Sequence, residues 1–200
     1  MIASPSLSRR RLLSALPVGA AALAWGRGVA AGNEHRDDGR PELQRRFEER
    51  VFSTYWTWRR LESNELRRAQ LAEERGRDLR EVMSDTTFFS EWQLIVGHVG
   101  LDEGGNAWIG LMSIENTTPR TILTNAGATA ADSLSQRLSA SILSVAATLE
   151  KGDYVIASGE LFHDHLDGYR ELGRVTGKPA DVRMQYPQFC VRYTAMRKAN

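Results

Sequence analysis

The spacing of apolar residues changes near residue 85 of this chain, and the change separates a helical part from a strand-rich part. Between residues 41 and 84, apolar side chains recur three or four positions apart, at Leu43, Phe47, Val51, Tyr55 and Trp58. That spacing places them on one face of a helix. After residue 88, β-branched and aromatic residues gather between turn-forming segments, which predicts strands. The sequence therefore predicts an α+β fold.

The helical part begins at Pro41, a residue well suited to the first position of a helix. Two interpretations of the rest stay open: one long helix, or two helices with a bend near Ser63 and Asn64. We expect Gly76 to end or loosen the second half, because glycine has a low helix propensity.

The strand-rich part predicts five strands and one helix. Strands are expected at residues 92–100, 107–114 and 120–124, with a glycine-rich turn between the first two. A helix is expected at residues 132–149, where apolar residues recur on one face. Strands at residues 154–162 and 189–196 follow, separated by a polar loop. The predicted order is three strands, a helix and two strands.

This order resembles the OB-fold, a five-stranded Greek-key barrel. Many OB-folds have a leucine before a lysine-glycine-aspartate turn and serine-glycine at the end of the next strand; here these are Leu149, residues 151–153 and residues 158–159. Residues 64–66 (asparagine, glutamate, leucine) and Trp92 are similar to those of small exported bacterial proteins of unassigned role with an OB-like core. The resemblance implies an N-terminal helical segment packed on a five-stranded OB-like β-barrel, with one helix between strands three and four.

The first residues resemble a bacterial twin-arginine signal peptide. Arg9 and Arg10 form the arginine pair between a serine and two leucines, and residues 29–31 supply small side chains for cleavage before Gly32. The resemblance implies export by the twin-arginine route, to the periplasm or out of the cell. The expected division is a signal peptide at 1–31, a flexible leader at 32–40, a helical segment at 41–84 and an OB-like barrel at 85–200.

Removal of the signal changes the sign of the net charge. The whole chain has 26 basic and 25 acidic residues, a formal charge of +1. Without the four arginines of residues 1–31, 22 basic and 25 acidic residues remain, a charge of −3. A negative chain does not attract polyanions, so nucleic acid is not the expected partner. The mature chain has no run of about 20 apolar residues, so we expect no membrane span in it.

The residue types that carry common catalytic chemistry are not grouped in this sequence. Cys190 is the single cysteine, which excludes an intramolecular disulfide, and its apolar neighbours predict a buried thiol. His98 is isolated in an apolar strand and is likewise expected in the core. The sequence has no nucleophile elbow, phosphate loop or dinucleotide fingerprint. We therefore predict no catalytic residue and no cofactor.

One cluster has side chains that bind metals. His163 and His165 are two residues apart, so on a strand they would share one face, and Asp167 follows closely. Together they could chelate a transition metal. The alternative is that they are the polar residues expected where a strand enters a loop.

The helical part contains a cluster of aromatic residues, Phe52, Tyr55, Trp56 and Trp58. The cluster is a candidate interaction surface. The alternative is a helix face that docks on the core.

These observations favour a non-enzymatic exported protein that binds a partner protein or a small ligand. One alternative is a metal-binding protein or metal-dependent enzyme that uses His163 and His165. Another is binding of single-stranded nucleic acid or oligosaccharide by the barrel, as OB-folds often do.

Overall fold

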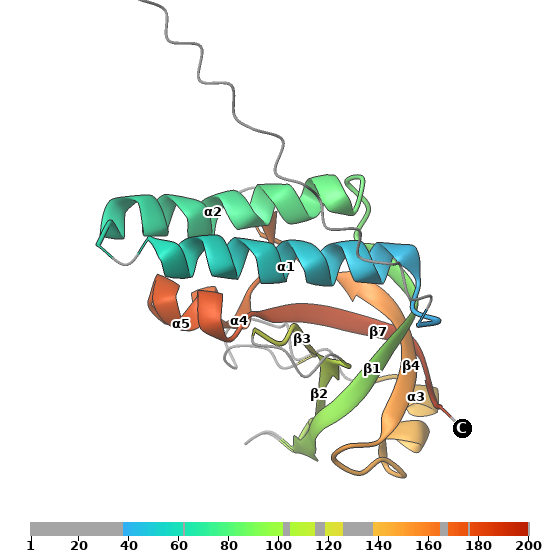
Figure 1. Ribbon diagram of the computed structural model, residues 1–200. Coiled ribbons are helices and arrows are strands. Elements are labelled where there is room, and N and C mark those ends of the chain that lie inside the picture. The colour runs from blue at the N-terminus through green and yellow to red at the C-terminus, as the bar shows by residue number, and fades with distance from the viewer. Residues whose placement is uncertain are drawn as a thin grey trace, which may run out of the picture. The chain divides into compact units, whose positions relative to one another are not determined.

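The computed structural model describes residues 38–61, 63–101, 105–114, 119–125, 138–164, 168–175 and 177–199. The helical part is a pair of helices that lie side by side, α1 at Glu42–Arg60 and α2 at Glu65–Val82 (Figure 1). The Asn64 side chain accepts a hydrogen bond of 2.9 Å from the backbone N–H of Arg67 and so caps α2. No helix in the described ranges is both long and apolar enough to cross a membrane.

The prediction that Gly76 ends or loosens the second helix is wrong, because α2 continues through it to Val82. The missing side chain matters for packing instead. A Cβ atom added to Gly168, in strand β6 (Gly168–Tyr169), would lie 2.9 Å from the Cα atom of Gly76. Glycine at both positions therefore lets the backbone of β6 approach α2 closely.

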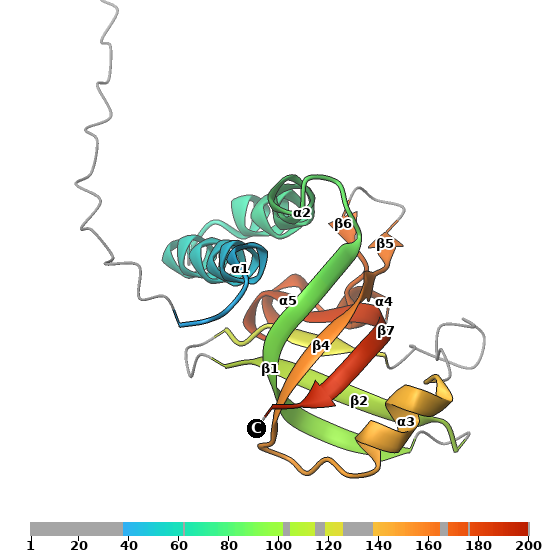
Figure 2. The same cartoon turned by 90° about the vertical axis from the view of Figure 1, so that its right-hand side faces the viewer.

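Five strands close into a barrel in the order β1-β2-β3-β7-β4 (Figure 2). Their bounds are Phe88–Leu101 for β1, Ala107–Ser113 for β2, Ile122–Thr124 for β3, Tyr154–Leu161 for β4 and Gln188–Lys198 for β7. Neighbouring strands are antiparallel except β3 and β7, which run parallel. The arrangement confirms the predicted α+β class with a five-stranded OB-like barrel.

The helix between β3 and β4 is α3, at Ala140–Ala146. It is shorter than the predicted helix at 132–149; residues 132–137 of that prediction lie outside the described residues. Ser139 caps α3 by accepting a hydrogen bond from the backbone N–H of Ile142. In both views α3 lies at the end of the barrel away from α1 and α2 (Figures 1 and 2).

The segment between β4 and β7 contains more structure than the polar loop that the sequence predicts. β5 (His163–Asp164) pairs with β6, and two short helices follow, α4 at Leu172–Val175 and α5 at Ala180–Gln185. The backbone N–H of Cys190 in β7 donates to the carbonyl of Arg170 at 2.8 Å. Such bonds join residues far apart in sequence, so local residue patterns do not reveal them.

The helical pair and the barrel share one hydrophobic cluster. The ring centroid of Phe47 in α1 lies 5.3 Å from that of Trp92 in β1 and 5.3 Å from that of Phe189 in β7. All three side chains are buried. A second, smaller cluster contains Tyr55 and Trp58 of α1, and Met184 of α5 packs with them.

A buried ion pair also connects α2 to the segment after β6. Arg75 is fully buried, and its Nη2 atom lies 2.6 Å from Oε1 of Glu171, which is also buried. The two terminal nitrogens of Arg75 lie 3.3 and 3.4 Å from the carbonyl oxygen of Arg183. The helical pair is thus attached to the barrel by polar as well as apolar contacts.

Candidate functional site

The outer face of the β1–β2 hairpin carries two aromatic rings and three glycines. A β-bulge lies between Val96 and His98 in β1. Beyond it, His98 stands opposite Gly110, and Gly100 stands opposite Trp108. Each ring therefore faces a glycine across the ladder, and the two rings occupy diagonal positions, close enough for aromatic side chains to meet.

The glycines leave the space that the rings occupy. A Cβ atom added to Gly100 would lie 2.6 Å from Nε2 of His98, closer than real Cβ contacts. A Cβ atom on Gly110 would lie 3.8 Å from Cζ3 of Trp108. Close by, Gly97 is covered by the side chain of Met112, which would lie 3.0 Å from an added Cβ. A side chain at Gly100 would therefore displace the His98 ring, whereas a Cβ atom at Gly110 would make only ordinary contact with Trp108.

The rings of His98 and Trp108 stack on each other, with centroids 3.9 Å apart and planes 21° apart. His98 is exposed and Trp108 is half-buried. The prediction that His98 lies in the core is wrong. The bulge shifts the alternation of β1, so that Val96 is buried and Val99 packs against the core while His98 points outward.

The strand beneath Trp108 is fixed on its other edge by Asn125. The side-chain oxygen of Asn125 accepts a hydrogen bond of 2.7 Å from the backbone N–H of Ile109, and its amide nitrogen donates to the carbonyl of Ala107 at 3.2 Å. The Asn125 side chain therefore extends the hydrogen bonding between β2 and β3 beyond the end of β3. This bonding holds the residues on either side of Trp108, so the ring pair has a rigid support.

Such a surface can bind a ligand that presents a flat face. Aromatic side chains bury a large apolar area at low conformational cost, and stacking on them is tolerant of ligand identity. In OB-folds, ligands bind on the face of strands two and three and on the neighbouring loops. Trp108 lies in the second strand of this barrel, next to the turn from β1. Residues 102–104 of that turn lie outside the described residues.

The sequence carries a signal for this surface that composition alone does not show. Both strands have an aromatic residue followed two positions later by glycine: His98 and Gly100 in β1, and Trp108 and Gly110 in β2. Residues two apart on a strand share a face, so each pair predicts a ring beside a bare patch of backbone. The strand register that brings the two pairs together is a tertiary property.

The aromatic cluster of α1 divides between core and surface. Tyr55 and Trp58 are 5% and 4% exposed and pack in the second cluster, whereas Phe52 is half-buried and Trp56 is 44% exposed. The rings of Phe52 and Trp56 meet edge to face, with centroids 6.0 Å apart. An interaction surface on α1 would therefore involve Phe52 and Trp56.

Of the predicted metal-binding residues, the structure describes His163, in β5. Its ring stacks on Tyr169 of β6, with centroids 5.7 Å apart. His165 and Asp167 lie outside the described residues, as do Arg9 and Arg10 of the predicted signal. Within the described ranges, no group of three or more His, Cys, Asp or Glu side chains is placed to hold a metal ion. The site at residues 163–167 stays a prediction.

Two described side chains that could act as nucleophiles, Ser158 and Cys190, are engaged or buried. The hydroxyl of Ser158 accepts a hydrogen bond of 3.0 Å from the backbone N–H of Glu91. Burial raises the pKa of the Cys190 thiol to about 11, so the reactive thiolate is not formed at neutral pH. Neither residue is placed for covalent catalysis.

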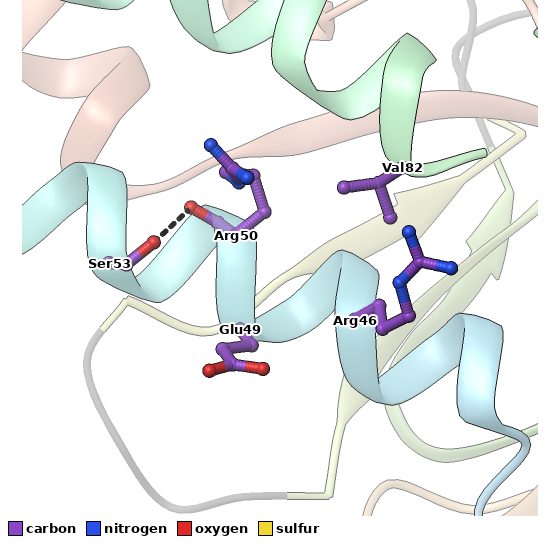
Figure 3. A pocket seen from close by; sticks show the side chains of 5 residues that line it. All are labelled: Arg46, Glu49, Arg50, Ser53 and Val82. Carbon is purple, nitrogen blue, oxygen red and sulfur yellow. Dashed lines mark hydrogen bonds between the residues drawn. The ribbon is translucent and has the colours of Figure 1, made fainter. Parts of the chain in front are cut away.

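A hollow of about 430 Å³ lies on the helical pair and is lined by Arg46, Glu49, Arg50, Ser53 and Val82 (Figure 3). Arg46 extends from α1 toward Val82 at the end of α2, Arg50 extends on the same side of α1 but away from Val82, and the Glu49 carboxylate points the other way. Cations are favoured at the C-terminal end of a helix, and Arg50 also pairs with Asp78 of α2 at 3.3 Å. The ion pair with Asp78 accounts for Arg50, and we assign no ligand to the hollow.

Comparison with models of known protein families and with curated protein sequences gives no match to this chain. The face formed by His98, Trp108 and the glycines between them combines accessible aromatic surface with a rigid support. It is the strongest candidate for a binding surface on the barrel.

Proposed function

We propose that this chain is an exported, non-enzymatic binding protein whose OB-like barrel binds a ligand by stacking on Trp108 and His98. The observation that carries the proposal is the stacked ring pair on its glycine floor. Two aromatic rings that stack on each other stand opposite two glycines, and the histidine ring is exposed to solvent. A surface built only for stability would gain more by burying these rings.

The proposal of export is supported by the N-terminal residues alone. Arg9 and Arg10, the short apolar stretch and the small residues 29–31 match the order of a twin-arginine signal peptide. The proposal of a non-enzymatic role is supported by the engaged state of Ser158 and the burial of Cys190.

The charge of the barrel favours a neutral oligosaccharide over nucleic acid. From residue 85 onward the chain has ten basic and thirteen acidic residues. Binding of single-stranded nucleic acid combines aromatic stacking with a basic groove. The excess of acidic residues in the barrel disfavours such a groove. A sugar ring needs only an aromatic surface for its apolar face and nearby polar groups.

The test compares two tryptophan variants. Trp108→Ala should weaken binding of soluble neutral oligosaccharides, measured by isothermal titration calorimetry, by about ten-fold or more, because a stacked ring contributes roughly 1–3 kcal/mol. Trp56→Ala, which removes an exposed tryptophan from α1, is the matched control and should leave binding unchanged. A screen of neutral oligosaccharides in which none binds, or equal affinity of Trp108→Ala and the parent protein, contradicts the proposal. Salt-sensitive binding of single-stranded DNA instead would favour the nucleic-acid alternative.

Export is tested separately. Conversion of both Arg9 and Arg10 to lysine should retain the protein in the cytoplasm, whereas Arg27→Lys should not. N-terminal sequencing of the exported protein should begin at Gly32. A cytoplasmic protein that retains Met1 would show that the N-terminal segment is not an export signal.

A further inference from the structure

A second hollow lies on the barrel itself, on the outer face of β1, β4 and β7. Its volume is about 390 Å³, within the range of small-molecule sites. Gln93 of β1 pairs with Ile156 of β4, and Ile156 pairs with Arg197 of β7. These three side chains form a row across the sheet, with an amide at one end, an apolar residue in the middle and a cation at the other end.

Apolar and aromatic side chains complete the lining. Ile114, just after β2, and Tyr154, at the start of β4, contribute to the hollow. Ile114 and Ile156 are half-buried, and Tyr154 is 53% exposed. The accessible lining is thus mixed, with polar groups beside apolar side chains. A few polar groups next to apolar surface can orient a small ligand.

The Gln93 amide is held in place by the chain that enters α1. Its Nε2 atom donates a hydrogen bond of 2.5 Å to the carbonyl of Gly39. The backbone N–H of Gln93 donates to Oε1 of Gln44, and its carbonyl accepts from Nε2 of the same side chain, at 2.8 and 2.6 Å. A primary amide has two N–H donors, so one remains for a ligand.

Arg197 is oriented by a strained residue. Glu91 has a φ of 56°, in the left-handed region, and lies where the pairing of β1 with β4 shifts between Phe89 and Trp92. Its carboxylate lies 2.8 Å from Nη2 of Arg197, and both side chains are 59% exposed. An ion pair between exposed side chains contributes little stability, less than the strain of a non-glycine residue in this region. Bulges next to functional sites re-aim side chains, and the effect of this one is to hold Arg197 over the hollow.

We propose that the hollow binds a small carboxylate with an apolar tail, and that Arg197 pairs with the carboxylate. A guanidinium has five donors, so it can hold Glu91 and a second carboxylate together. The tail would pack against Ile114, Ile156 and the ring of Tyr154, and the free N–H of Gln93 would donate to the second carboxylate oxygen. This site is distinct from the ring pair of His98 and Trp108, and the proposal goes beyond the proposed function.

The probe is octanoate, titrated by calorimetry into the mature protein with two related compounds as controls. Octanol has the tail without the charge, and acetate has the charge without the tail. The proposal predicts saturable binding of octanoate and much weaker binding of both controls. Equal binding of octanol would show that the cation takes no part, and equal binding of acetate would show that the apolar floor takes no part; either result overturns the proposal.

Two pairs of variants locate the site. Arg197→Gln should weaken octanoate binding by about ten-fold, since a charge-assisted hydrogen bond is lost. Arg192→Gln, which alters another exposed arginine of β7, paired with Glu160 at 3.6 Å, should not. Glu91→Gly should weaken binding without lowering the thermal midpoint, because glycine relieves the strained φ while Arg197 loses its orienting partner. Unchanged affinity in Arg197→Gln, or loss of affinity in Trp108→Ala, would place octanoate elsewhere and refute the assignment.

Discussion

Replacement of Arg75 by methionine should destabilise the protein by about 3–5 kcal/mol, the usual effect of removing one partner from a buried ion pair. Arg75 is fully buried, and the Glu171 side chain that it contacts at 2.6 Å is 7% exposed. Methionine fills much of the same volume but donates no hydrogen bond. The variant therefore leaves a buried carboxylate without its cation and the carbonyl oxygen of Arg183 without a donor.

The double variant Arg75→Met/Glu171→Leu separates the charge effect from simple loss of packing. With both charges gone, the cost of burying an unpaired carboxylate disappears, and the free energy of unfolding should return to within about 1 kcal/mol of the parent value or exceed it. Arg80→Met is the matched control on α2. Arg80 pairs with the exposed Asp85 at 3.1 Å, so its replacement should change stability by less than about 1 kcal/mol.

The assay is urea unfolding followed by far-ultraviolet circular dichroism, with the slope against denaturant compared among variants to verify two-state behaviour. A loss in Arg75→Met no larger than that in Arg80→Met would refute the reasoning. A double variant as unstable as the single one would also refute it, because the loss would then come from packing rather than from an unpaired charge.

Two further results are expected. Gly168→Ala should lower the thermal midpoint, with a loss of about 1–3 kcal/mol, because the added Cβ would lie 2.9 Å from the Gly76 backbone; an unchanged midpoint would mean that β6 and α2 can separate freely. Cys190 has its pKa raised by burial from 9.0 to about 11, so its contribution to stability is full below pH 9 and is lost as the pH rises toward 11. Cys190→Ala should therefore lose less stability than the parent protein between pH 9 and 11, and identical slopes in that window would contradict the assignment.

Local patterns in this chain are sufficient to predict α1 and the five strands of the barrel. The stripe from Leu43 to Trp58 predicts α1, and the turn at residues 151–153 predicts the start of β4. Both signals lie within a few residues of the structure that they specify, because helix periodicity and turn chemistry are local properties. The three-strand, helix, two-strand order follows from such signals, and the order is enough to predict an OB-like barrel.

The same local rules fail where distant residues meet. β6 lies against α2 where Gly168 approaches Gly76, and nothing near Gly168 in the sequence reveals that neighbour. Gly76 is misread for the same reason, since its low helix propensity is outweighed by the contact. The buried partner of Arg75 lies 96 residues away, so charge patterns along α2 cannot identify it.

For the candidate binding surfaces too, the sequence specifies some features and the tertiary structure decides the others. The sequence alone specifies which residues are aromatic, which are glycine and which strand carries each. It does not specify that His98 points outward, because one extra residue in a bulge reverses the side on which every later side chain lies. It also does not specify that His98 stacks on Trp108 or that Glu91 holds Arg197. Those contacts depend on the register between strands, and the register is set only when the whole barrel closes around its core.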